Sequence, residues 1–135
     1  MKNYIYSTGK RKKSIARVFL SKGNGVILIN NLSNYFQGSS RAVNVLLKPL
    51  RVLHMDKKVD LKITVKGGGF TGQSEAIRHG VSKAIVKYND LQNNTDDSFK
   101  KILKDFGFLT RDSRKVERKK VGHRKARKKE QYSKR

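Results

Sequence analysis

The last 25 residues of this chain cannot build a hydrophobic core of their own. Residues 111–135 carry 13 Lys and Arg against three Asp and Glu, and their only large aliphatic side chains are Val116 and Val121. Two such side chains cannot offset a backbone ordering cost of roughly 1–2 kcal/mol per residue. We therefore expect a globular body, residues 1–106, followed by a C-terminal segment, residues 107–135, that is an extended basic arm.

The charge of the whole chain predicts a polyanionic partner. Its 33 Lys and Arg outweigh 10 Asp and Glu, which gives a formal net charge of +23 and excludes the near-neutral surface of an ordinary cytosolic enzyme. A solvated, disordered tail is the alternative for residues 111–135. We favour a polyanion, because about every second residue there is cationic and little acid is present to neutralise it. The absence of Cys excludes disulfides and thiolate metal sites, and no apolar run is long enough for a membrane span.

Alternating and β-branched runs predict the strands of the body. Residues 4–7 and 14–20 form a predicted hairpin with the charged loop 9–13. A turn at residues 23–25 precedes a strand at 26–29, whose unbroken apolar run suits a buried position. Residues 59–65 alternate apolar and polar side chains and predict a half-buried strand.

Four helical segments are predicted beside these strands, three of them before residue 90. Residues 31–36 are expected to form a short helical turn, and residues 40–47 a helix interrupted by Pro49, whose ring removes an amide donor. The strongest helix, residues 71–89, is predicted to have Thr71 as its N-cap and Glu75 in its first turn. Its apolar stripe consists of Ile77, Val81, Ala84, Ile85 and Tyr88.

The last predicted helix covers residues 96–106, with Asp96 and Asp97 at its start and Gly107 at its end. Its apolar stripe consists of Phe99, Ile102, Leu103 and Phe106. The body is thus predicted to be α+β, a compact mixed sheet packed on a few helices.

Gly67, Gly69 and Gly72 match the G-x-G-x-x-G pattern of dinucleotide sites. Such a site also needs a second parallel strand that ends in an acidic residue, whereas residues 88–97 are polar and typical of a turn. We interpret the glycines as positions where the backbone turns tightly and approaches another backbone.

Catalysis, metal binding and cofactor binding are not expected. The only imidazoles, His54, His79 and His123, are far apart in sequence, and no acidic cluster suits Mg²⁺. A nuclease or a nucleotide-binding enzyme therefore remains a weak alternative. We expect no small-molecule substrate.

The basic residues that remain predict contacts to RNA phosphates. They comprise Lys10, Arg11, Lys12, Lys13 and Arg17 near the hairpin, and Arg78 and Lys83 on the strongest helix. In the C-terminal segment they are Arg111, Arg114, Lys115, Arg118, Lys119, Lys120, Arg124, Lys125, Arg127, Lys128 and Lys129, with Lys134 and Arg135 at the end. Few aromatic residues interleave them, so we expect recognition of RNA shape and backbone rather than base-by-base readout. An architectural DNA-binding protein is the alternative, but it would need an intercalating apolar wedge or a symmetric dimer arm.

Four motifs resemble the bacterial-type family of ribosomal small-subunit protein nine. Residues 7–18 (STGKRKKSIARV) resemble its opening motif and residues 66–80 (KGGGFTGQSEAIRHG) its strand–glycine–helix signature. Residues 109–120 (LTRDSRKVERKK) and 131–135 (QYSKR) resemble its tail. The resemblance runs from about residue 4 to the last residue.

This resemblance implies a structural, rRNA-binding component of the head of the small ribosomal subunit, with neighbouring ribosomal proteins as further partners. It implies a body similar to the second domain of small-subunit protein five, and an arm that runs through rRNA towards the peptidyl-site tRNA. The signature would place Gly67, Gly68, Gly69 and Gly72 at the rRNA surface, and the tail would place Ser133, Lys134 and Arg135 near the tRNA. It also implies a bacterial cytoplasm in preference to an organelle, with no membrane association.

Overall fold

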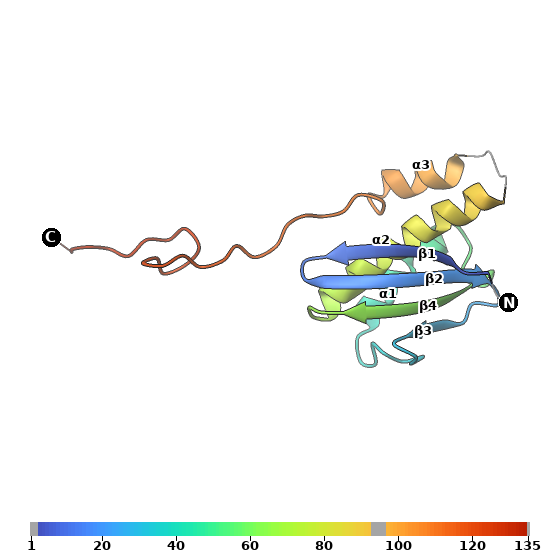
Figure 1. Ribbon diagram of the computed structural model, residues 1–135, viewed down its shortest axis with the longest axis horizontal. Helices are drawn as coiled ribbons and strands as arrows, with labels where there is room; N and C mark the ends of the chain where they lie inside the picture. The colour runs from blue at the N-terminus through green and yellow to red at the C-terminus, as the bar shows by residue number, and fades with distance from the viewer. Residues whose placement is uncertain (1–2, 93–96, 135) are drawn as a thin grey trace.

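Four strands form one mixed sheet in the order β1-β2-β4-β3 (Figure 1). The computed structural model describes residues 3–92 and 97–134. Strands β1 (Ile5–Arg11), β2 (Ser14–Lys22) and β4 (Val59–Lys66) are antiparallel neighbours, and β3 (Ile27–Ile29) pairs with β4 in parallel. The predicted α+β class with a mixed sheet is confirmed.

One face of this sheet is covered by helices. Helix α2 (Phe70–Leu91) packs against β1 and β2, and α1 (Ser40–Val52) lies beside it (Figure 1). The alternation predicted for β4 is confirmed, because its odd-numbered side chains are buried. The stripe predicted for α2 is also confirmed, because Ile77, Val81, Ala84 and Ile85 are fully buried and Tyr88 packs against the core. The opposite face of the sheet keeps exposed side chains.

Helix α1 continues through Pro49, so the predicted interruption is wrong. It begins at Ser40, where Ser39 Oγ accepts a bond from the amide of Ala42, and it ends at Val52. The Pro49 ring is fully buried beside Leu50. Burial of both side chains offsets the one backbone hydrogen bond that proline cannot make.

The start of α2 also differs from the prediction. The helix begins at Phe70, and its N-cap is Gly69 rather than Thr71. Glu75 consequently falls in the second turn, where it pairs with Arg11 instead of capping the helix. Glu75 therefore forms a long-range ion pair with Arg11 instead of the expected interaction with the positive end of the helix dipole.

Three further features differ from the predictions: the hairpin loop, the strand at residues 26–29 and the helical turn at residues 31–36. The hairpin loop is only two residues, Lys12 and Lys13, because the strands extend further towards each other. Strand β3 is an edge strand and covers only Ile27–Ile29. The buried position predicted for residues 26–29 holds for Ile29 alone, whereas Val26 is exposed and Ile27 and Leu28 are only partly buried. The helical turn expected at residues 31–36 is a series of turns, which begins with Asn30 and Asn31 in the left-handed region.

Helix α3 (Ser98–Asp105) packs on α2. Leu103 is fully buried and Phe99 and Ile102 are partly buried, but Phe106 of the predicted stripe is 58% exposed. Asp97 occupies the N-cap without a side-chain bond, whereas Asp96 lies outside the described residues. The predicted stop at Gly107 is confirmed by its φ of 73°.

Beyond Asp105 the described chain forms no helix or strand. One isolated β-bridge joins His123 to Lys129, and most side chains after residue 109 are exposed. Figure 1 shows this part running away from the sheet and helices. Within residues 3–92 and 97–134, no helix is long and apolar enough to cross a membrane.

Candidate nucleic-acid interface

The turn between β1 and β2 is held against the glycine loop, residues 67–69, that follows β4. Ser14 Oγ and Gln73 Nε2 both donate to the carbonyl oxygen of Gly67, at 2.9 and 3.1 Å. A Cβ on Gly67, whose φ is 76°, would lie 2.5 Å from the carbonyl oxygen of Lys13. The interpretation of a tight turn and close backbone approach is therefore confirmed for Gly67, but not for Gly69, where an added Cβ would meet no atom within 4 Å. No strand follows α2 in the described chain, as a dinucleotide site would require.

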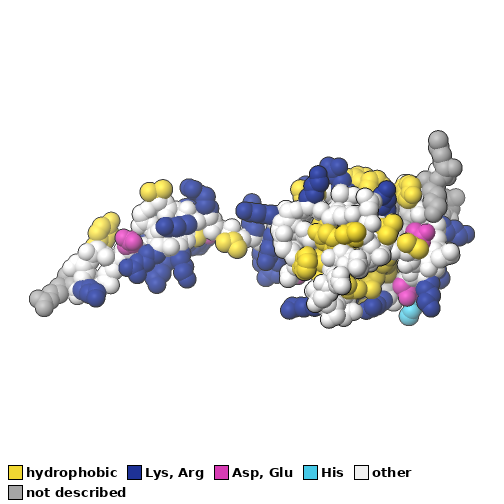
Figure 2. Space-filling model, turned by 90° about the horizontal axis from the view of Figure 1, so that it is seen from below, with side chains coloured by type: hydrophobic (Ala, Val, Ile, Leu, Met, Phe, Trp, Pro, Cys, Tyr) yellow, Lys and Arg dark blue, Asp and Glu magenta, His cyan; other side chains and the backbone are white. Residues whose placement is uncertain are grey.

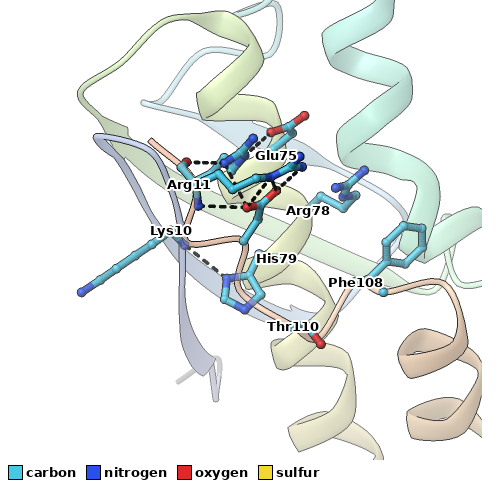
Figure 3. Close-up of a pocket in the computed structure, with 10 residues that line it drawn as sticks. Lys10, Arg11, Glu75, Arg78, His79, Phe108 and Thr110 are labelled. Atoms are coloured by element: carbon cyan, nitrogen blue, oxygen red, sulfur yellow. Dashed lines mark hydrogen bonds and ion pairs between the residues drawn. The ribbon is translucent and has the colours of Figure 1, made fainter. Parts of the chain in front are cut away.

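Arg11 lies beside this turn and points inward rather than to solvent (Figure 3). Its Nε lies 2.7 Å from Glu75 Oε2, and one terminal nitrogen lies 3.4 Å from Asp112 Oδ1. The same nitrogen donates to the carbonyl oxygen of Arg114 at 2.7 Å, and the side chain is only 13% exposed. Arg11 therefore joins β1, α2 and the C-terminal segment, and its guanidinium is occupied within the protein.

Asp112 is the acidic centre of this junction. Hydrogen bonds from the Arg114 side chain and backbone, together with the charge of Arg11, hold the pKa of Asp112 well below its usual range. In return the carboxylate raises the pKa of Arg114. Asp112 therefore remains ionised at neutral pH and keeps both arginines in place.

His79 makes a second link between the body and the C-terminal segment, near Lys10 (Figure 3). The amide of Lys10 donates to Nδ1 at 3.3 Å, and Nε2 lies 3.2 Å from the carbonyl oxygen of Leu109. Because Nδ1 accepts a bond, the proton of the neutral ring is on Nε2 and is donated to Leu109. Burial, and then the charge of Lys83, lower the pKa of His79. A neutral imidazole thus links β1 to the C-terminal segment.

Acid is expected to loosen this link. The pKa of His79 in the folded protein lies below 6.5, the ordinary value for histidine, and nearby Lys83, Arg111 and Arg78 oppose its protonation. The unfolded chain therefore binds the proton more tightly, so stability falls as the pH drops below about 6.5 and levels off below the folded pKa. Urea unfolding between about pH 7.5 and pH 5.5 measures this loss. His79→Gln should reduce the pH dependence, whereas His54→Gln, at an exposed position, should retain it. Equal pH dependence in wild type and His79→Gln would contradict the assignment.

Arg78 and Lys83, both predicted as RNA contacts, take part in internal contacts. The Arg78 guanidinium lies over the Phe108 ring, 5.1 Å from its centroid, and Phe108 is buried. Lys83 Nζ donates to the carbonyl oxygen of Thr8 at 3.2 Å, and so secures the edge strand β1 against α2. The sequence alone does not distinguish basic side chains that bind within the protein, such as Arg78 and Lys83, from those that are available to bind phosphate.

A groove of about 1070 Å³ lies between the β1–β2 turn, the glycine loop and the C-terminal segment. It is lined by Lys12, Lys13, Gly68 and residues 113–119. In the described part of the chain, no ion pair involves Lys12, Lys13, Lys115, Arg118 or Lys119. Figure 2 shows Lys and Arg gathered where the segment leaves the body and along its length, with few acidic side chains among them.

The rest of the C-terminal segment carries a few internal ion pairs. Glu117 accepts from Lys120 and Arg127, both at 3.1 Å, and these bonds lower the pKa of Glu117. Arg124 lies 4.0 Å from Glu130. The remaining predicted contacts of this region are exposed: Arg111, Lys125, Lys128, Lys129 and Lys134.

The other predicted site residues are spread over the body and the chain end. Lys10 and Arg17 are exposed on β1 and β2, Gly69 caps α2, and Gly72 is buried in its first turn. Ser133 is exposed and its carbonyl oxygen accepts a bond from Gln131, whereas Arg135 lies outside the described residues. Nothing in the described chain brings three His, Cys, Asp or Glu side chains together as a metal site.

Sequence reasoning missed the residues that organise this junction. Glu75, His79 and Asp112 were not expected to join the body to the C-terminal segment, and their partners are 30 or more positions away in several cases. The sequence did contain a signal for these contacts. Glu75 on α2 and Asp112 within the basic C-terminal run are acidic residues for which the sequence analysis had assigned no ion-pair partner.

Together these features give a basic groove on an α+β body and a cationic segment fixed at its root. A family model of ribosomal protein S9/S16 matches residues 9–135. The chain belongs to this family. A member of the S9/S16 family is a structural component of the small ribosomal subunit, binds rRNA during translation, and has rRNA and other ribosomal proteins as partners. The family is structural rather than enzymatic.

Proposed function

We propose that the chain holds rRNA of the small-subunit head in the groove between the β1–β2 turn and the C-terminal segment. The observation that carries this proposal is the set of cations without ion-pair partners in the described chain that line the groove: Lys12, Lys13, Lys115, Arg118 and Lys119. Lys and Arg bind phosphate oxygens without reading the sequence, so their role is to neutralise the RNA backbone and fix its position.

The basic residues fall into two groups, those bound within the protein and those exposed at the groove, and this supports the same proposal. Arg11, Arg78 and Lys83 stabilise the junction, which sets the direction in which the C-terminal segment leaves the body. The exposed cations on either side of the groove then face one RNA strand together. We keep residues 1–106 as the body and 107–135 as the arm, whose first eight residues are docked on the body.

Paired charge removal at the turn tests this interface. Lys12→Gln with Lys13→Gln should weaken binding to purified small-subunit rRNA and make the slope of log K against log salt shallower by about 1 to 2. Lys57→Gln with Lys58→Gln is the matched control, because these exposed lysines lie beyond the opposite end of β4. Equal effects of the two double variants would show that net charge, and not the groove, determines binding.

Direct competition separates the proposal from an architectural DNA-binding function. Structured rRNA should displace duplex DNA from the full chain, since the groove and segment supply phosphate contacts without an intercalating wedge. A preference for duplex DNA, or loss of the chain from small subunits in modest salt, would contradict the assignment to rRNA.

The end of the C-terminal segment is proposed to reach the peptidyl-site tRNA, as the resemblance implies. Deletion of Ser133–Arg135 should leave the body folded and assembled, because these residues add two side-chain charges and Ser133 and Lys134 are exposed. Retention of tRNA in the peptidyl site should fall, and a filter-binding assay on isolated small subunits measures it. Failure of the truncated chain to enter the subunit would contradict this modular function.

The motifs of residues 7–18 and 66–80 resemble those of the bacterial-type family, and this resemblance supports a bacterial ribosome and a cytoplasmic location in preference to an organelle. Fractionation of the source cell would test the location.

A further inference from the structure

The face of the sheet that the helices leave open gathers aromatic side chains. Tyr4 and Tyr6 are 50% and 45% exposed, and Phe19 of β2 lies between them. The Tyr6 and Phe19 ring centroids are 5.1 Å apart, and those of Tyr4 and Phe19 are 6.3 Å apart. Single exposed aromatics are ordinary, but here Phe19 contacts both tyrosines, and the three side chains form one aromatic cluster, the platform, on the open face.

Cations follow the platform along the same face of the sheet towards the β1–β2 turn, as the strand register shows. Phe19 is opposite Lys62 of β4, Thr8 is opposite Arg17, and Ile15 stands between Lys10 and Lys66. Side chains of one face alternate along a strand, so these residues share the face that points away from α2. Lys10, Arg17, Lys62 and Lys66 are all exposed.

The acidic side chain that the register places on this face is Asp60 of β4. Asp60 directs Oδ1 to the backbone amides of Asn24, Gly25 and Val26, at 2.9, 3.1 and 2.9 Å. Its charge stabilises the turn that leads into β3. The four cations outnumber this carboxylate on the strands of the open face, and the aromatic side chains lie at one end of it.

We propose that this open face binds unpaired bases of single-stranded RNA. Tyr4, Tyr6 and Phe19 stack on bases, while Arg17, Lys62 and the neighbouring lysines hold the phosphates. Base stacking on exposed aromatics of a four-stranded sheet is a general means of binding single-stranded RNA. The four cations favour such a polyanion over a protein partner. This inference rests on the proposed rRNA binding and adds a second surface, opposite the helices, with a different chemistry.

Tyrosine removal tests the stacking without changing the charge. Tyr4→Ala with Tyr6→Ala should weaken binding of an oligouridylate of about eight nucleotides by roughly tenfold or more. Binding of an RNA duplex should stay within about twofold, and the salt slope should be unchanged, because no cation is lost. The conservative pair Tyr4→Phe with Tyr6→Phe should keep the affinity, because stacking does not need the hydroxyl.

Tyrosine emission supplies a second readout on the folded full chain. Oligouridylate should quench the emission of the wild type, and the paired Tyr→Phe variant should lose most of that quenching while it still binds. This measurement tests whether Tyr4 and Tyr6 stack on bases even if the alanine variant does not fold. Unchanged oligouridylate affinity in the folded alanine variant, equal losses on single strand and duplex, or quenching that persists in the Tyr→Phe pair would overturn the inference. The proposed groove fails separately, if the Lys12 and Lys13 variants bind rRNA like wild type.

Discussion

Replacing Gly9 by alanine is expected to destabilise the body strongly. Gly9 lies on β1, and a Cβ there would overlap the carbonyl oxygen of Ala76 and the amide of Gly80 on α2. Both are backbone atoms that cannot rotate away, and Ser7 Oγ donates to the Gly80 carbonyl beside them. We expect a loss of about 3 kcal/mol or more, a large share of the roughly 5–15 kcal/mol that stabilises a domain. Thermal and urea unfolding followed by circular dichroism measure it.

Gly69→Ala is the matched control for this substitution. A Cβ on Gly69 would meet no atom within 4 Å, and its φ of −104° suits any residue. We expect a change of at most about 1 kcal/mol. If Gly9→Ala melted like Gly69→Ala, the close packing of β1 on α2 would be wrong.

Local patterns predicted the elements that bury one regular face. The alternation of β4 and the stripe of α2 are set by the periods of strand and helix, and both are buried as expected. Pro49 shows the limit of such rules, since its ring is buried in α1 and packing there outweighs the helix-breaking tendency. Residues 26–29 show another limit, because an apolar run does not reveal whether its strand is central or at an edge.

The candidate site was harder to predict, because its organisation depends on contacts between distant segments. A count of charges treats all Lys and Arg alike. Arg11, however, forms ion pairs with Glu75 and Asp112, whereas Lys12 beside it is exposed. Sequence analysis also found few aromatics among the basic residues. Tyr6 and Phe19 become neighbours of Lys62 only when three strands pair, so no linear window contains the platform.

Neutralising the C-terminal segment is expected to remove most of the affinity for rRNA. The nine Lys and Arg of residues 115–129 would be replaced by Gln, while residues 107–114 and their contacts to the body stay intact. If these cations neutralise about eight phosphates, the slope of log K against log salt should become shallower by about 6 to 7. At about 0.05 M salt the affinity should fall by more than about a thousandfold. Titration of labelled small-subunit rRNA over a range of salt concentrations measures both.

The stability of the same variant separates electrostatics from folding. Thermal unfolding should match that of wild type, because side chains 115–129 lie outside the hydrophobic core and are mostly exposed. The exposed pair Lys57→Gln with Lys58→Gln serves as the reference for charge removed elsewhere. If the neutralised chain kept wild-type affinity and slope, cations of the body, at the β1–β2 turn or on the open sheet face, would carry the binding. The C-terminal segment would then act only after assembly, and the counterion-release account of this segment and of the groove that it lines would be wrong.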